Sequence, residues 1–400
     1  MGRSSRPVRA SPARMGEDVT VNLSPQHPLA AGLTHDSRLV RAYRGLRSDT
    51  LPVWFMRQAG RSLPEYRELR VGTRMLDACL DPAMASEITL QPVRRHGVDA
   101  GIFFSDIVVP LKLVGVDVEI QPGRGPVFGR AYADAAAVAE LTAVDPARLD
   151  EAAGPITEAV QRTVAELATI TAPDAPTSTP LIGFAGAPFT LAAYLAEGGP
   201  SKDHLAARTL MHADPGAWRA LMDWTAELTG RFLRTQVLAG ASAAQLFDSW
   251  AGALSLADYD THVAPASAAA LAHVHDLTYE TTDASGGAGT HAVPVVHFGV
   301  GTGELLGAMK AVGVDVVGVD YRVPLDVAAL RVGEGVPLQG NLDPALLAAP
   351  RPVLEEAVRD VIARGRTAPS HVFNLGHGVP PETDPDVLTR VVELVHEAGR

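Results

Sequence analysis

Residues 181–199 read LIGFAGAPFTLAAYLAEGG, and this stretch contains the pattern that decides the fold. The apolar run 181–184 has the length of a strand that is buried on both faces, and a helical pattern follows at 188–195. Two glycines and a proline interrupt the uncharged part, which is also shorter than the roughly 20 apolar residues that a membrane span needs. The stretch therefore predicts one strand of a parallel sheet and the helix that follows it.

The same alternation recurs along the whole chain. The predicted strands are 52–56, 100–104, 181–184, 244–247, 293–298, 316–319, 336–340 and 371–375. The predicted helices between them are 83–95, 188–195, 216–237, 264–279, 304–311, 326–330 and 352–363. Alternating strands and helices indicate a parallel α/β fold, and eight such units favour a closed (β/α)8 barrel, a TIM barrel, over an open sheet.

Several segments lie outside this alternation. Residues 1–30 are predicted to be a disordered N-terminal arm, and 171–180 and 281–289 are predicted to be inserted, mobile loops. The long interval 105–180 must hold extra elements, including a glycine- and proline-rich turn at 121–125. No internal repeat and no linker divides the chain, so we expect one domain.

The charge of the chain limits the partners it can take. The 400 residues carry a formal net charge of −12, from 34 Lys and Arg against 46 Asp and Glu. A field of this sign repels nucleic acid and anionic membranes, so we expect neither as a partner. Cys79 is the only cysteine, which excludes a disulfide within the chain and a zinc site with two thiolates, and fits a reducing cytoplasm.

The segment Arg57-Gln58-Ala59-Gly60-Arg61 directly follows the first predicted strand, where a barrel of this kind places its active residues. Gly60 permits a tight or positive-φ backbone, which lets the two arginines converge on one ligand. Guanidinium groups stay protonated and bind carboxylates through a bidentate fork. The segment predicts a site for a carboxylate-bearing anion, against the alternative of a solvated basic surface.

Other polar side chains follow other predicted strands at the same rim. Asp106 and Ser249 come after the second and fourth strands, and Tyr194 lies on the helix after the third. An aspartate in this position is either a helix N-cap or a functional acid, and the sequence leaves both open. His377 lies between two glycines, which indicates a close backbone approach, and a lone histidine is either structural or catalytic.

No metal-binding or nucleotide-binding motif is present in the sequence. The glycine-rich segment 299–303 lacks the spacing of a dinucleotide fingerprint. The 13 histidines show no spacing to cysteine or carboxylate that is typical of a metal site. The residues alone therefore give no sign of a dinucleotide site or of a metal site.

Six motifs in order give the chain a resemblance to a known family. They are PVWFMRQAGRSLPEYRELR (52–70), TLQPVRRHGVDAGIFFSDIVVPLKLVG (89–115), LIGFAGAPFTLAAYLAEGG (181–199), AAQLFDSWAG (243–252), LQGNLDP (338–344) and FNLGHGVPPETDP (373–385). In these motifs the chain resembles the uroporphyrinogen decarboxylase family, from about residue 37 to the C-terminus.

The resemblance implies a single-domain, distorted (β/α)8 barrel over residues 37–400, acting as a cytoplasmic homodimer without metal or organic cofactor. It implies that uroporphyrinogen III loses its four acetate carboxyls as CO2, giving coproporphyrinogen III in haem biosynthesis. Decarboxylation needs an electron sink, and a pyrrole protonated on a ring carbon supplies one.

The resemblance also implies roles for single residues. Asp106 matches the aspartate that meets the pyrrole N–H groups, and we expect it to stabilise the cationic ring. The proton donor is open between Arg57, a substrate carboxyl and an ordered water, because a guanidinium is a reluctant acid. The positions that match substrate contacts are Arg57, Gln58, Ala59, Gly60, Arg61, Arg70, Asp106, Tyr194, Ser249 and His377.

Two positions depart from the family pattern, and two other functions stay open. Ser62 stands where the family usually has Tyr, which puts a rim contact in doubt, and Tyr321 stands where it often has Trp. One alternative is a zinc-dependent methyltransferase of the same superfamily, which would hold its metal with His and Cys at the barrel mouth. The other is a tetrapyrrole-binding protein without catalytic activity.

Overall fold

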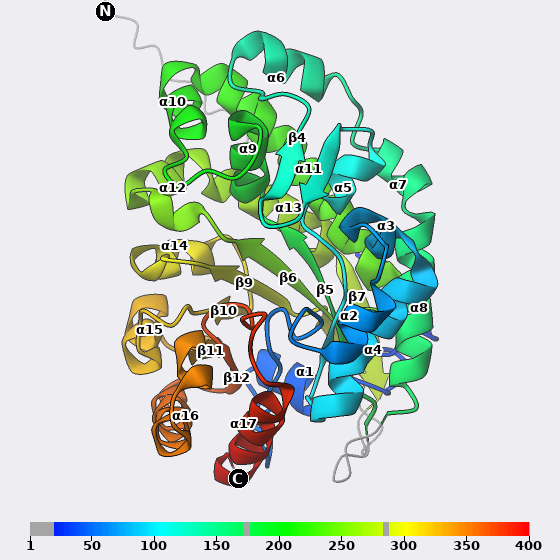
Figure 1. The fold of residues 1–400 in the computed structure, drawn as a ribbon, viewed down its shortest axis with the longest axis vertical. Coiled ribbons are helices and arrows are strands. Elements are labelled where there is room, and N and C mark those ends of the chain that lie inside the picture. The colour runs from blue at the N-terminus through cyan, green and yellow to red at the C-terminus, as the bar shows by residue number, and fades with distance from the viewer. Residues whose placement is uncertain (1–19, 171–176, 283–287, 400) are drawn as a thin grey trace, which may run out of the picture.

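The structure is a computed structural model that describes residues 20–170, 177–282 and 288–399. Seven parallel strands form a central sheet that curls, and helices cover its outer side (Figure 1). Strands that follow one another in this sheet are always neighbours, in the order β12-β11-β10-β9-β6-β5-β2. These strands are β2 (Gly101–Ile102), β5 (Leu181–Gly186), β6 (Ala243–Asp248), β9 (Val295–Gly299), β10 (Val316–Gly318), β11 (Leu338–Leu342) and β12 (His371–Leu375).

The central strands confirm the predicted parallel α/β fold. β5, β9, β11 and β12 are buried along their whole length, as apolar runs covered on both faces should be. Two strands begin two residues later than predicted, after Pro294 and after Pro337. Both prolines lack an N–H to donate, but their carbonyls accept bonds from Ala244 and Val317 in the neighbouring strands.

The first predicted strand, 52–56, is wrong as a full strand. It forms a single parallel bridge, Val53 to Phe373 of β12. Phe373 N donates to Pro52 O at 2.8 Å, and on the other side Asp99 N donates to Val53 O at 2.8 Å. The curled sheet is therefore barrel-like, and a closed eight-stranded barrel is not confirmed.

Most of the predicted helices are present. The helices around the sheet are α1 (Arg38–Tyr43), α2 (Pro64–Leu69), α3 (Met75–Leu80), α4 (Pro82–His96), α5 (Val109–Leu113), α6 (Ala135–Thr142), α7 (Arg148–Ala152), α8 (Gly154–Leu167), α9 (Pro188–Glu197), α10 (Leu205–Ala213), α11 (Pro215–Leu238), α12 (Leu256–His262), α13 (Ala264–His275), α14 (Leu306–Ala311), α15 (Leu325–Val332), α16 (Arg351–Gly365) and α17 (Pro385–Ala398). The start of α4 shows how the sequence specifies where a helix begins. Asp81 Oδ1 accepts hydrogen bonds from Ala83 N and Met84 N, both at 3.0 Å, and Pro82 is the first residue of the helix. None of the described helices is both long enough and apolar enough to cross a membrane.

The long interval 105–180 holds extra elements, as predicted. Besides α5 to α8 it contains an antiparallel hairpin, β3 (Val118–Gln121) with β4 (Gly125–Phe128). The predicted turn at 121–125 is the tip of this hairpin, where Gly123 and Gly125 have positive φ. The hairpin contributes to the cavity described below.

The helix predicted at 264–279 ends early. α13 stops at His275, and Leu277–Thr282 form β7 because Leu277 and Tyr279 are buried and the segment pairs with two other strands. These strands are β1 (Val21–Asn22), parallel to β7, and β8 (Ala288–Ala292), antiparallel to it. The loop predicted at 281–289 is wrong in its described part, where Thr281 and Thr282 of β7 pair with Gly289 and Ala288 of β8, and 283–287 lie outside the described residues.

The predicted N-terminal arm, 1–30, is also wrong in its described part. Residues 1–19 lie outside the described residues, whereas 20–30 pack against the barrel. Leu23 and Leu29 are buried, and His27 Nε2 lies 2.9 Å from Val237 O, so apolar burial and a hydrogen bond hold this segment. Of the predicted loop 171–180, residues 171–176 lie outside the described residues.

Asp99, just before β2, joins the two ends of the curled sheet. Its Oδ2 accepts from Val53 N at 2.8 Å and lies 2.8 Å from His396 Nε2, while Oδ1 accepts from Arg38 at 3.3 Å. The carboxylate is almost fully buried. One side chain thus connects the first apolar run, α1 and α17 to the strand β2.

We predict that Asp99→Ala lowers the free energy of unfolding by about 1–3 kcal/mol, since it leaves the buried Val53 N–H and the partly buried Arg38 and His396 without a partner. Chemical denaturation followed by circular dichroism measures this. The control is Asp77→Ala, which removes an exposed ion pair with Arg74 and should leave stability almost unchanged. Equal effects of the two substitutions would contradict the role assigned to Asp99.

Candidate active site

A cavity of about 1170 Å³ opens at the carboxyl ends of the central strands. It is lined by residues from the ends of β2, β5, β6 and β9, from the β3–β4 hairpin and from the segments after 56 and 376. Nine of the ten predicted site residues line it: Arg57, Ala59, Gly60, Arg61, Arg70, Asp106, Tyr194, Ser249 and His377. The structure thus brings together side chains that are far apart in the sequence.

Gln58 is the exception among the predicted site residues. Its side chain is fully buried and does not line the cavity. Its Nε2 donates to Ala100 O at 3.0 Å, and its Oε1 accepts from Phe55 N at 3.0 Å. Gln58 therefore fixes the backbone of the arginine segment against the start of β2, because its amide is consumed by main-chain partners.

Arg57 has the conformation that the sequence analysis expected of Gly60. Arg57 has a φ of +60°, in the left-handed region, whereas Gly60 does not have a positive φ. The space beside Gly60 is nevertheless small, since a Cβ there would lie 3.0 Å from Arg57 O. A Cβ on Gly378 would collide with Cδ of Arg57. The backbone around Arg57 and the bare surface of Gly378 together fix where this side chain lies.

Asp106 is not the N-cap of α5, because that position belongs to Val108 and no side chain caps the helix. Its Oδ1 accepts from Val108 N at 3.1 Å, which closes a turn just before α5. The residue also lines the cavity at the end of β2. Burial raises the pKa of the carboxyl above its ordinary value, and the Val108 N–H and the Arg57 charge oppose this shift in part. The remaining carboxylate oxygen is available to a ligand.

Aromatic rings build one wall and the floor of the cavity. Tyr194 stacks on Trp250 with ring centroids 3.8 Å apart, and Trp250 stacks on His204 at 4.2 Å on its other side. Burial, with the nearby Asp106 charge, raises the pKa of Tyr194 to about 12, so its hydroxyl stays protonated. The floor is apolar. The Phe247 ring packs edge to face on those of Phe184 and Phe298, with ring centroids 5.4 and 5.9 Å apart.

His377 lies where the two glycines beside it allow a close approach of the backbone, as predicted. A Cβ at Gly376 would collide with the backbone of Tyr321, and Gly378 faces Arg57. Burial, followed by the charges of Arg57 and Arg322, lowers the pKa of His377 below its ordinary value of 6.5. The imidazole is therefore neutral at pH 7 and offers one donor and one acceptor to a ligand.

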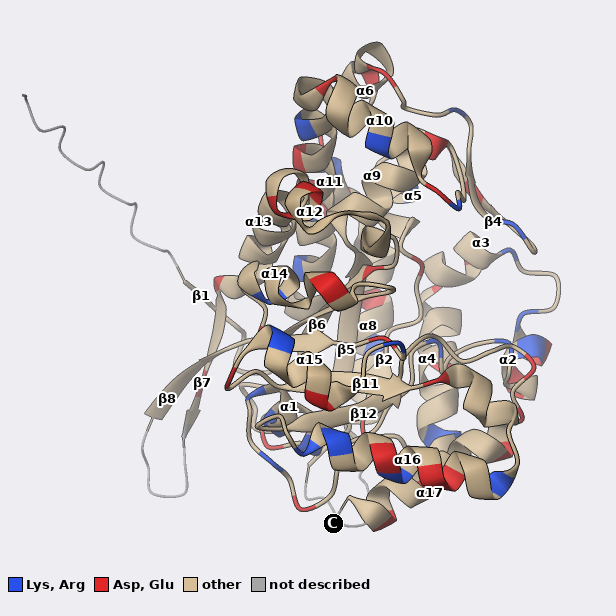
Figure 2. Ribbon diagram, turned by 90° about the vertical axis from the view of Figure 1, so that its left-hand side faces the viewer, with Lys and Arg blue, Asp and Glu red and all other residues tan. Residues whose placement is uncertain are grey.

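The charge lining the cavity is strongly positive, against the negative charge of the whole chain. On the outside, acidic and basic side chains alternate along helices such as α16, where Arg351 pairs with Glu355 and Arg364 pairs with Asp360 (Figure 2). In the cavity, Arg57, Arg61 and Arg70 form no ion pair with any carboxylate of the described chain. Their charge is thus available to a bound anion.

Two cavity arginines were missed by the sequence analysis. Arg74 lies at the start of α3, where it pairs with Asp77 and reaches Glu119. Arg124 lies in the tip of the β3–β4 hairpin, between two glycines. The glycine-rich turn around Arg124 was the only local signal. Five arginines and two carboxylates, those of Asp106 and Glu119, thus line the cavity.

Comparisons with known proteins agree with this geometry. The model of the family "Uroporphyrinogen decarboxylase (URO-D)" matches residues 34–398. The chain belongs to the uroporphyrinogen decarboxylase family. It is 71% identical to a protein named uroporphyrinogen decarboxylase from Leifsonia xyli, over 94% of this chain and 99% of that protein. It is 62% identical to one of the same name from an Arthrobacter species, over 91% and 98%.

A solved structure supports the fold of this family member. A methyltransferase from Methanosarcina mazei superposes with a TM-score of 0.68 at 16% identity, covering 90% of this chain and 97% of the methyltransferase. At this identity the likeness shows the fold alone. Ser62, one of the two departures from the family pattern, is buried and does not line the cavity. Its side chain therefore cannot make the rim contact that a tyrosine would make at this position.

We predict that Arg57→Gln raises the pKa of His377 towards 6.5, since a neighbouring positive charge is removed while burial remains. The measurement is an NMR titration of the histidine ring protons, with His377 assigned through His377→Gln. Arg359→Gln, on the exposed side of α16, is the control and should not change this pKa. No change with Arg57→Gln would contradict the proximity of the two groups.

Proposed function

We propose that this chain is a carboxy-lyase that removes the four acetate carboxyls of uroporphyrinogen III as CO2 and gives coproporphyrinogen III, without metal or organic cofactor. The observation that carries the proposal is the cavity itself, an apolar floor of phenylalanines under five arginines with Asp106 at one strand end. A tetrapyrrole with eight carboxylates needs both kinds of surface. Family membership over residues 34–398 supports the same conclusion.

In this proposal the arginines capture the substrate. Arg57 and Arg61 bind its carboxylates through bidentate hydrogen bonds, which an arginine can form without first breaking an internal ion pair, and Arg70 adds its positive charge. Arg70 is already oriented, since its guanidinium donates to Tyr66 Oη and Thr73 O, both at 2.8 Å. The Phe184, Phe247 and Phe298 rings pack against the pyrroles.

Asp106 acts on the ring. A proton adds to a pyrrole carbon, and the resulting cation receives the electron pair of the breaking C–CO2 bond. The CO2 leaves, and a second proton then reaches the exposed methylene carbon while the ring loses the first. The Asp106 carboxylate accepts hydrogen bonds from the pyrrole N–H groups and stabilises the cation; one well-placed group of this kind contributes about 3–4 kcal/mol.

Residues 37–400 act as one catalytic unit in this proposal, with the segment 52–56 closing the barrel through the Val53 bridge rather than as a full strand. The bonds from Asp99 N to Val53 O and from Phe373 N to Pro52 O support closure on both sides. The proposal includes a homodimer and a cytoplasmic location, as the family resemblance implies, with no nucleic acid or membrane as partner. Light scattering of the purified protein measures the oligomeric state.

The described cavity does not favour the methyltransferase alternative. Among its described lining residues His377 is the only histidine and there is no cysteine. Cys79 is buried in α3, and burial raises the pKa of its thiol well above the ordinary value. A thiolate ligand is therefore not offered to the cavity by the described residues.

The test is an anaerobic assay with uroporphyrinogen III, in which products are oxidised to porphyrins and separated by their number of carboxyl groups. We expect wild-type protein to give a four-carboxyl product. A protein that binds the substrate and returns it with all eight carboxyls would support the binding-only alternative.

In the same assay Asp106→Asn should keep substrate affinity and lower kcat about 100- to 1,000-fold, since the cation loses its carboxylate. Because burial raises the pKa of Asp106, wild-type kcat should fall with decreasing pH from above the ordinary aspartate range, and the variant should lack this decline. Asp49→Asn, on an exposed aspartate outside the cavity, is the control. Near-normal kcat in Asp106→Asn would refute the electrostatic role.

Arg57→Lys and Arg61→Lys should each raise KM by about 10- to 100-fold and make KM more sensitive to salt, because an ammonium replaces a bidentate fork. Steady-state kinetics at two salt concentrations measure this. Arg359→Lys, an exposed arginine of α16, is the matched control. An unchanged KM in both cavity variants would remove the argument for a carboxylate clamp.

A further inference from the structure

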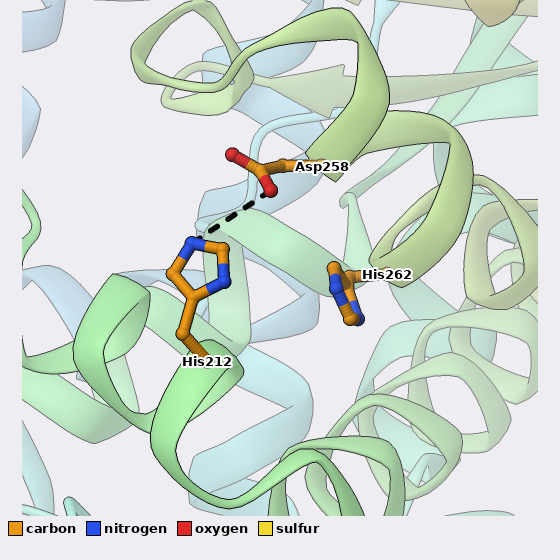
Figure 3. Close-up of side chains that lie close together, drawn as sticks. All are labelled: His212, Asp258 and His262. Carbon is orange, nitrogen blue, oxygen red and sulfur yellow. Dashed lines mark ion pairs between the residues drawn. The ribbon is translucent and has the colours of Figure 1, made fainter.

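His212, Asp258 and His262 form a cluster outside the cavity. They come from two helices, α10 and α12, and their side chains point toward one another (Figure 3). One candidate ligand atom of each lies within 4.8 Å of the other two, and His212 Nε2 lies 3.7 Å from Asp258 Oδ1. Within the described chain this is the one group of three such side chains that converges in this way.

The local structure already aims these side chains. Asp258 and His262 are four residues apart on α12, so they share one face of the helix. Ser255 Oγ donates to Asp258 Oδ2 at 2.9 Å, which leaves Oδ1 facing His212. Trp218 Nε1 donates to His262 O at 3.1 Å and fixes the end of α12.

The distances suit a small transition ion. Ligand atoms about 2.05 Å from a tetrahedral zinc ion lie about 3.4 Å from one another. The 3.7 Å between His212 and Asp258 is close to this value, and all three ligand atoms lie within 4.8 Å of one another, so side-chain rotations would have to draw them together around an ion. Two imidazoles and a carboxylate form a donor set that suits zinc-class ions, whereas Mg²⁺ and Ca²⁺ prefer oxygen ligands.

We propose that His212, Asp258 and His262 bind one divalent ion of the zinc class, with water in the remaining position. None of the three lines the cavity, so the ion has a structural role and no part in decarboxylation. It ties α10 to α12. α10 begins directly after His204, which stacks on Trp250, and Trp250 stacks on Tyr194 in the cavity wall. The bound ion therefore stabilises the position of α10, and through His204 and Trp250 the position of Tyr194 in the cavity wall.

The test measures Zn²⁺ binding to chelator-treated, full-length protein by competition with a chromogenic chelator. We expect one ion per chain. His212→Ala and His262→Ala should weaken binding by more than about tenfold, since even residues that only orient a ligand contribute that much. His291→Ala is the matched control, because His291 belongs to a separate cluster with Arg44 and His35. It should bind Zn²⁺ as the wild type does.

A second measurement separates the role of the ion from its binding. Hydrogen exchange of α10 and α12 should slow when Zn²⁺ is added to wild-type protein and should not change in His212→Ala. Because His212 is exposed, His212→Ala should unfold at the wild-type temperature when zinc is absent, and His262→Ala, at a partly buried position, should unfold close to it. Binding that is equal in all variants, or that needs millimolar Zn²⁺, would overturn the proposal.

Discussion

The cavity depends on keeping guanidinium groups unpaired beside an apolar floor. Arginines on the outer helices have carboxylate partners on the protein, such as Glu355 and Asp360. Arg57 and Arg61 have none among the described residues, although the chain has an excess of acidic residues. Local self-repulsion of this kind is tolerated because a left-handed backbone, a buried glutamine and a glycine surface fix the segment that carries both charges.

The same constraint explains the electrostatics of the neighbouring groups. Burial raises the pKa of Asp106 and lowers that of His377, while the charge of Arg57 shifts both values down. Tyr194 keeps its proton because its ring is packed against Trp250 and faces a carboxylate. A bound anion with many carboxylates therefore meets five arginines, two carboxylates and the neutral polar groups of Tyr194 and His377 on the cavity wall.

Much of this arrangement could be predicted from the sequence, for a physical reason. Parallel strands that are buried on both faces appear in the sequence as apolar runs. Because the carboxyl ends of such strands all lie at the same end of the sheet, the polar residue after each run is placed at the mouth of the cavity. Asp106, Ser249 and His377 were found in this way. Gln58 was predicted as a substrate contact but does not line the cavity, because a residue inside a functional motif gives no sign that its amide is used by the backbone.

The other differences between prediction and structure come from contacts between segments that lie far apart in the sequence. The pattern of residues within one segment does not show these contacts. Leu277–Thr282 became a strand because a neighbouring strand was available on each side. His212 and Asp258 are 46 positions apart, and only the packing of α10 near α12 places them together.

The contact between Arg57 and Gly378 has a consequence for the history of the family. A side chain at position 378 would force the Arg57 side chain out of its observed place. Descendants that abandon the arginine are released from the glycine, so the two sites should covary across distant members.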